Sequence, residues 1–271
     1  MKLFNNHTHT EFSHDGTGSI DKISVCAVNQ NLFGFAVTDH CDCEYINAPA
    51  VKALLNKSYN SAKYAKKKYN EQLIISCGVE IGEAIFDLSV AENIISSYNW
   101  DVVLGSVHAV RLDKYEMPFS TIDFSTFTDK QIQKYVDAYF ADVLDTAIQC
   151  DYDVLCHLSV ILRYVTYKYN RFVDMSRYDR TIEKILKTVI ERDKTLEINT
   201  SGIDKGYLMP DEKIIEVYKS LGGKRITLGS DSHAPDSISN GLEEGVNVIK
   251  KYGFDKLTYY IDRKPIEYSI I

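Results

Sequence analysis

Short apolar runs alternate with longer helical stretches along this chain, and this alternation constrains the fold more than any other feature. We expect the runs to be strands, at Lys2–Asn6, Gly34–Thr38, Leu73–Glu80, Val102–Val107, Asp153–Cys156, Thr195–Asn199 and Arg225–Gly229, with Leu257–Ile261 as an outer strand. Strict alternation of strand and helix implies parallel strands joined by crossover helices. About seven such units in 271 residues favour a closed or nearly closed β/α barrel, with residues 1–271 forming one domain.

The composition indicates where this chain works and what it binds. Hydrophobic residues make up 45% of the chain, but no segment reaches the roughly 20 apolar residues of a membrane-spanning helix, so we expect no membrane association. The first residues lack the apolar core of an export signal, which favours the cytoplasm. A formal net charge of -7 repels polyanions, so nucleic acid is not an expected partner.

Imidazole and carboxylate side chains stand at the ends of the expected strands. They are His7, His9, His40, Glu80, His108, His157, Asp231 and His233. Because the carboxyl ends of barrel strands converge on one face, residues far apart in the sequence would meet in one pocket. Zinc, manganese and iron bind to these two kinds of side chain. The joint arrangement therefore predicts a metal site.

Taken singly, these residues also have simpler explanations. His7 and His9 point to the same side of an extended chain, and Asp231-x-His233 repeats that spacing. An ion pair could neutralise a buried Glu80 as well as a metal could. A lone histidine such as His157 is more often a hydrogen-bonded core residue. Cys41-x-Cys43 could hold a metal too, but no second cysteine pair with zinc-site spacing accompanies it, so reduced thiols are expected.

Six short motifs contain the ligand-type residues other than His157. They are His7-Thr8-His9-Thr10, Ser13-His14-Asp15-Gly16, Thr38-Asp39-His40, Gly78-Val79-Glu80, Gly105-Ser106-Val107-His108 and Gly229-Ser230-Asp231-Ser232-His233. In combination they resemble the motifs of the PHP (polymerase and histidinol phosphatase) superfamily. The stretch from Cys156 to Tyr164 looks most like the monofunctional histidinol-phosphate phosphatases. The resemblance implies a distorted (β/α)7 barrel of the PHP type that holds three divalent transition-metal ions, namely zinc, iron or manganese.

The resemblance also implies a role for each ligand. The first ion would be held by His7, His9, Glu80 and Asp231, the second by Glu80, His108 and His157, and the third by Asp15, His40 and His233. Glu80, as the bridging ligand, and Asp231 are the implied catalytic residues. Relatives carry either Asp or His at the position of Asp15, and His14 lies beside it. The Asp-Gly pairing favours Asp15 as the ligand, with His14 then behind it or facing the substrate.

Three ions suit the cleavage of a phosphate ester. Two close metals can share a water and lower its pKa from 15.7 to about 7, which supplies hydroxide for attack on phosphorus at neutral pH. The resemblance therefore implies a phosphomonoesterase acting on L-histidinol phosphate in histidine biosynthesis. Two alternatives stay open: another PHP phosphoesterase acting on nucleotides or nucleic-acid ends, and a metal-binding domain without catalysis.

Substrate contacts are expected from arginines near the strand ends. Arg163 lies six residues after His157, and Arg111 lies three after His108; either guanidinium could hold phosphate oxygens. Asn199 ends another strand and could orient a ligand or simply form a turn.

The connection between Arg111 and Thr126 could form a wall for the substrate. It carries Tyr115, Met117, Phe119 and Phe124, on which an imidazole could stack, while Asp113 or Glu116 could meet an ammonium group. The alternative is a loop packed on its own aromatic side chains.

Overall fold

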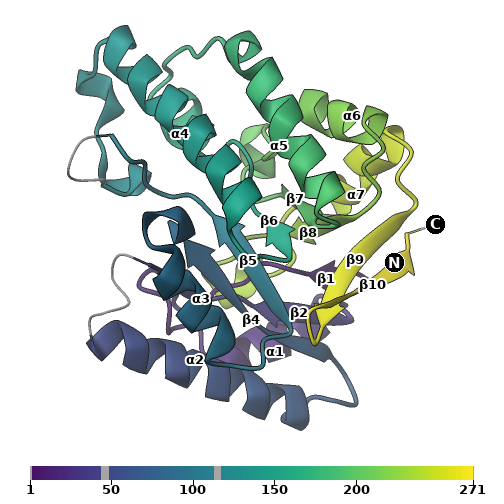
Figure 1. The fold of residues 1–271 in the computed structure, drawn as a ribbon. Coiled ribbons are helices and arrows are strands. Elements are labelled where there is room, and N and C mark those ends of the chain that lie inside the picture. The colour runs from purple at the N-terminus through teal and green to yellow at the C-terminus, as the bar shows by residue number, and fades with distance from the viewer. Residues whose placement is uncertain (1, 44–48, 113–116, 271) are drawn as a thin grey trace.

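The centre of the molecule is a curved parallel sheet surrounded by helices, shown by the computed structural model for residues 2–43, 49–112 and 117–270 (Figure 1). The strands pair in the order β1, β2, β4, β5, β6, β7 and β8. Their bounds are β1 Phe4–Asn5, β2 Gly34–Val37, β4 Ile74–Gly82, β5 Val102–Ser106, β6 Val154–Leu155, β7 Thr195–Asn199 and β8 Ile226–Gly229. Each neighbouring pair is parallel, as the alternation of strand and helix predicts.

The two edges of this sheet meet. The backbone N–H of Asn6 donates to the carbonyl oxygen of Leu228 at 2.9 Å, and just beyond the strands the N–H of Asp231 donates to the carbonyl oxygen of His7 at 3.0 Å. The sheet is therefore nearly closed, and the distorted β/α barrel expected from the sequence is confirmed. Closure is also what brings the first and last sequence motifs together.

A short extra strand, β3 (His40–Asp42), continues the strand position occupied by β2. Val37 of β2 pairs with Cys77, and His40 of β3 pairs with Glu80, so both follow β4 in one register. Sequence reasoning missed β3 and ended this strand at Thr38. The register places His40 directly beside Glu80, which matters for the site.

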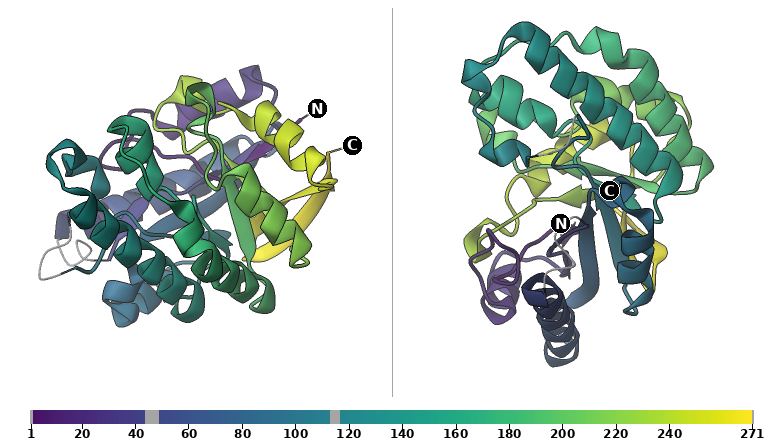
Figure 2. Two further views of the ribbon diagram at one scale, coloured as in Figure 1. Left: turned by 90° about the horizontal axis from the view of Figure 1, so that it is seen from above. Right: turned by 60° about the vertical axis from the view of Figure 1, so that its left-hand side comes forward.

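Helices cover the outside of the barrel. They are α1 (Ile20–Asn29), α2 (Pro49–Lys68), α3 (Leu88–Ser96), α4 (Asp129–Gln149), α5 (Asp179–Glu191), α6 (Glu212–Ser220) and α7 (Leu242–Lys251). In Figures 1 and 2, α4, α5 and α6 lie together on one side, and α1, α2 and α3 lie on the other. Thr128 and Gln131 form a capping box at the start of α4, which fixes where that helix begins. None of the helices described is long and apolar enough to cross a membrane.

A C-terminal hairpin covers the end of the barrel at which the strands begin, opposite their carboxyl ends. It consists of β9 (Lys256–Ile261), which confirms the expected outer strand, and β10 (Lys264–Ser269), which was not expected. The carbonyl oxygen of Tyr260 accepts a hydrogen bond from the Ser76 hydroxyl at 2.7 Å, and the Tyr260 hydroxyl pairs with that of Thr195 at 2.6 Å. Both partners lie near the amino-terminal ends of barrel strands, so the hairpin leaves the carboxyl ends free for a site.

The hairpin turn is anchored by an ion pair that provides a test of this packing. Arg263 contacts the carboxylate of Asp153, which is mostly buried, at 2.9 Å. It also contacts the carboxylate of Asp151, which is exposed, at 2.7 Å. Arg263→Ala should lower the free energy of unfolding by about 1.5–3 kcal/mol, because a buried carboxylate loses charge-assisted hydrogen bonds. Urea denaturation measures the change.

Lys256 offers a matched control in the same hairpin. It pairs with Glu267 at 3.2 Å, and both side chains are exposed. Lys256→Ala should cost less than about 1 kcal/mol, since exposed ion pairs contribute little. Equal effects of the two substitutions would contradict the anchoring role of Arg263.

Candidate metal centre

The carboxylate of Glu80 lies at the centre of a cluster of histidines at the carboxyl ends of the barrel strands. Its side chain is fully buried, and ring nitrogens of five histidines lie within 4.0 Å of it. The distances are 3.2 Å to His7, 3.5 Å to His9, 2.9 Å to His40, 3.2 Å to His108 and 2.8 Å to His157. Side chains from β4 and from the ends of four other strand positions thus converge on one carboxylate.

The two oxygens of Glu80 face different histidines. Oε2 faces His7, His9 and His40, whereas Oε1 faces His108 and His157. The Nε2 atoms of His108 and His157 lie 3.4 Å apart. The arrangement is that of a carboxylate placed between two groups of imidazoles, which suits a bridging ligand.

Asp231 joins the group on the Oε2 side. Its Oδ1 atom lies 3.3 Å from His9 Nε2 and 3.7 Å from His7 Nε2. His7, His9 and Asp231 place one ligand atom each within 4.8 Å of one another, and His7, Glu80 and His157 form a second such group. All of these residues are buried.

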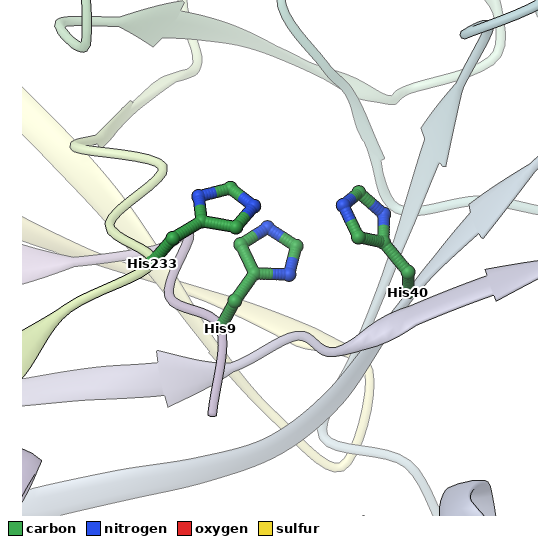
Figure 3. A group of neighbouring side chains, drawn as sticks. All are labelled: His9, His40 and His233. Carbon is green, nitrogen blue, oxygen red and sulfur yellow. The ribbon is translucent and has the colours of Figure 1, made fainter. Parts of the chain in front are cut away.

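A third group lies toward the surface. The rings of His9, His40 and His233 point toward one another in Figure 3, and the ring centroids of His9 and His233 are 4.1 Å apart. Asp15 lies between His40 and His233. Its carboxylate oxygens are 3.2 Å from His233 Nε2 and 3.8 Å from His40 Nε2. The adjacent His14 is mostly exposed, and its Nε2 lies 3.7 Å from Asp15; His14, Asp15 and His40 also place one ligand atom each within 4.8 Å of one another. Asp15 thus contacts both His40 and His233, and its choice over His14 as a ligand stays a prediction.

The cluster has bonding capacity that the described residues do not use. Among those residues, several buried atoms facing the cluster lack a hydrogen-bond partner: His7 Nε2, His9 Nε2, His40 Nδ1, Glu80 Oε2 and His233 Nε2. Unpaired buried polar atoms are costly and rare in native proteins. Nitrogen and carboxylate oxygen atoms that converge without partners fit coordination to metal ions.

Electrostatics keeps the carboxylates in the ionised form that coordinates metals. Burial alone would raise the pKa of Glu80, but His7, His40 and His108 outweigh it and hold that pKa well below its ordinary value. The pKa of Asp231 is likewise held well below its ordinary value, because His7, His9 and Arg163 outweigh the effect of burial. Both side chains are thus anions at neutral pH.

Sequence reasoning missed Glu197, which lies directly behind the cluster. Its Oε1 atom is 2.7 Å from His7 Nδ1, and its Oε2 atom accepts a hydrogen bond from the backbone N–H of His157 at 2.8 Å. Glu197 lies in the middle of β7 and is fully buried. A charged residue between the apolar residues Leu196 and Ile198 was the available signal, because a buried carboxylate needs partners.

Arg163 borders the cluster, and Asn199 does not face it. The Arg163 guanidinium donates to Asp231 Oδ2 at 3.1 Å and to the Ser201 hydroxyl. Asn199 Oδ1 accepts from the Ser201 hydroxyl at 2.5 Å, while its Nδ2 donates to Glu197 at 3.2 Å. Asn199 is fully buried and links Arg163 to Glu197 through Ser201, so the geometry gives it a supporting place and not a contact with substrate.

The structure does not bring Arg111 to the cluster. Its Nε atom donates to Asp142 at 2.9 Å, and its Nη2 atom donates to Asp145 at 2.7 Å, both on α4. The guanidinium is therefore held against a helix. This pairing disfavours the interpretation of Arg111 as a phosphate-binding residue, because its donors are already engaged.

A cavity of about 410 Å³ opens beside the cluster. His14, Asp15, His40 and His108 border it on one side, and its walls include Phe12, Leu54, Phe119 and Tyr164. Of the aromatic residues in the connection between Arg111 and Thr126, Phe119 thus reaches the cavity wall. Phe124 instead packs in the core against Phe127 and Tyr135, as the alternative interpretation expects. The expectations for Asp113, Tyr115 and Glu116 lie outside the described residues.

Cys41 and Cys43 take no part in the cluster. Both are buried free thiols that belong to the hydrophobic core. Burial raises the pKa of each thiol, which disfavours the thiolate form that binds metal.

Comparison with known proteins identifies what the chain is similar to. The model of the PHP domain family matches residues 5–201. A probable histidinol-phosphatase of Clostridium acetobutylicum is 31% identical over 98% of this chain and 100% of its own length. One of Thermotoga maritima is 30% identical over 96% of both chains. The crystal structure of histidinol phosphate phosphatase from Lactococcus lactis, complexed with zinc, L-histidinol and phosphate, is 24% identical and has the same fold, with a TM-score of 0.80 over 98% of this chain and 99% of that one.

The unpartnered buried atoms lead to a prediction about stability. Zinc at about 100 times its dissociation constant should stabilise the chelator-treated protein by about 2.7 kcal/mol for each site that binds it in the folded state alone. Magnesium should stabilise it far less, since it prefers oxygen ligands. Glu80→Gln should lose most of the zinc effect, because the central carboxylate becomes a neutral amide. Thermal unfolding with each ion measures the shifts, and equal stabilisation of both proteins would contradict the central place of Glu80.

Proposed function

We propose that this chain, which belongs to the PHP domain family, hydrolyses L-histidinol phosphate to L-histidinol and phosphate with the help of divalent transition-metal ions. The observation that most supports this proposal is the convergence of five histidines on Glu80 beside an open cavity. Its relatives of similar length named as probable histidinol-phosphatases support the substrate. As an enzyme of histidine biosynthesis, it would work in the cytoplasm.

The proposed centre holds three ions of zinc, iron or manganese. His7, His9, Glu80 and Asp231 would hold the first, and Glu80, His108 and His157 the second. Asp15, His40 and His233 would hold the third. The two faces of the Glu80 carboxylate support the bridging role, and the position of Asp15 between His40 and His233 supports its inclusion.

Bound divalent ions would activate water for attack on phosphorus and neutralise charge on the phosphate. The residues of the chain would hold the imidazoles in place and bind the phosphate. Glu80 and Asp231, both held as anions, fix the imidazoles around them in place. Arg163 presents a guanidinium beside Asp231, where it can donate to phosphate oxygens.

The cavity suits the organic part of this substrate. Phe12, Phe119 and Tyr164 provide apolar rings against which an imidazole can pack, and Asp42 and Glu83 add carboxylates to the same cavity. Such a lining favours a small cationic, ring-bearing molecule. His14, on the rim and mostly exposed, is placed to meet the substrate as it enters.

One experiment tests the proposed function directly. The purified protein should contain two to three transition-metal ions per chain by elemental analysis and should release phosphate from L-histidinol phosphate. Nucleotides and a chromogenic phosphate ester should be hydrolysed far less efficiently, and a chelator should abolish the reaction. Full metal content without phosphate release from any of these compounds would favour a non-catalytic metal-binding domain. Preference for nucleotides would favour the other phosphoesterase.

Arg163 provides a test of phosphate recognition apart from metal binding. Arg163→Ala should lower kcat/KM for L-histidinol phosphate roughly ten- to hundredfold, because a charge-assisted hydrogen bond contributes about 1.5–3 kcal/mol. Arg163→Lys should recover only part of this loss, since lysine keeps the charge but not the planar fork.

The controls for Arg163 are metal content and a second arginine. Both Arg163 variants should keep the metal content of the parent protein, because arginine is not a ligand. Arg111→Ala should leave kcat/KM nearly unchanged, as its guanidinium is engaged on α4. Unchanged efficiency in Arg163→Ala would remove Arg163 from phosphate binding.

A further inference from the structure

We propose that Glu197 is a positioning residue that fixes the ring of His7 and the backbone of His157 and so sets the affinity of the centre for metal. This inference rests on the proposed metal centre but not on the identity of the substrate. Glu197 touches neither the cavity nor the convergent ligand atoms; it acts through two of the ligand residues.

Glu197 holds the ring of His7 through one of its two nitrogens. Its Oε1 atom lies 2.7 Å from His7 Nδ1, which is within hydrogen-bond distance. The other ring nitrogen, Nε2, faces Glu80 and Asp231 and has no hydrogen-bond partner among the described residues. A ring held through one nitrogen keeps the other nitrogen directed at the place where a metal ion would bind.

The second oxygen of Glu197 acts on the other group of ligands. It accepts a hydrogen bond from the backbone N–H of His157. The φ angle of His157 is 25°, which is positive, and residues other than glycine rarely adopt a positive φ. Such a conformation persists only where neighbours hold it. One carboxylate therefore fixes a side chain on one side of Glu80 and a backbone turn on the other.

The surrounding chain is built to admit this carboxylate. A Cβ atom at Gly229 would lie 2.2 Å from Glu197 Oε1 and 2.6 Å from the Cβ of His7. Only glycine leaves room for the contact between Glu197 and His7. Asn199 donates to the same carboxylate at 3.2 Å, which completes its hydrogen bonds.

Glutamine at position 197 separates the effect of charge from the effect of shape. If the amide nitrogen faces His157, two N–H donors oppose each other. If it faces His7, the proton must leave Nδ1 for Nε2, and the lone pair that would bind metal is lost. Either orientation damages one ligand, although the side chain keeps its size.

The experiment measures zinc affinity in chelator-treated full-length protein by competition with a chromophoric chelator. Glu197→Gln should bind zinc roughly 10- to 100-fold more weakly than the parent, as is typical when a partner of a ligating histidine is changed. Glu197→Asp, which keeps the acceptor but is shorter, should fall between the two. Affinity equal to the parent in Glu197→Gln would overturn the proposal.

Thr195→Val is the matched control on the same strand. It removes the buried hydrogen bond to Tyr260 at the opposite end of the barrel and should leave zinc affinity unchanged. A loss equal to that of Glu197→Gln would mean that Glu197 acts only through general stability, and would overturn the proposal.

A measurement on the parent protein decides the matter even if Glu197→Gln does not fold. Nitrogen-15 NMR of the zinc-loaded protein, with the His7 signals assigned by their absence in His7→Asn, should show the proton of His7 on Nδ1. A proton on Nε2 would overturn the proposal. A protein that passes these tests but releases no phosphate from L-histidinol phosphate would contradict the proposed function and leave the role of Glu197 intact.

Discussion

The buried carboxylate of Glu80 is the constraint on which the rest of this structure depends. Five histidines surround it, and burial without such partners would favour its protonated form. Those histidines come from strand positions on both sides of β4, including the first strand of the chain. An open sheet would leave Asp231, at the end of β8, far from β1. Closure between β1 and β8 removes that distance, so the barrel and the cluster require each other.

The sequence allowed the barrel and the convergence of its strand-end histidines to be predicted, for a definite physical reason. In parallel strands with crossover helices, the direction of every strand is known, so residues that follow apolar runs must share one end. The position of a residue at the end of a strand can therefore be predicted from the sequence, as it was for His7 and His108. The direction in which a residue at that end points is not visible. Asn199 ends a strand and Arg111 follows one, as expected, but Asn199 turns inward to Glu197 and Arg111 turns outward to α4.

Glu197 and β3 were missed because both depend on contacts between segments far apart in the chain. Glu197 is explained by His7, which lies 190 residues away, and no local pattern connects them. The β2–β3 strand position is interrupted at Thr38 and Asp39, where the Asp39 carboxylate accepts hydrogen bonds from Thr10 and Ser13. Its continuation could not be inferred without knowing that β4 runs on past Glu80 as a partner.

Two glycines beside the cluster, Gly229 and Gly82, follow from the same crowding. At Gly229 an added Cβ would meet Glu197, and at Gly82 it would lie 2.2 Å from Asp42 Oδ1 and 3.1 Å from His108 Nδ1. Neither glycine has a positive φ among the backbone angles described, so conformational freedom does not explain them. Each instead leaves space where a carboxylate approaches a histidine of the cluster from behind. At these two positions a carboxylate can come close to a histidine of the cluster because the strand carries no side chain there.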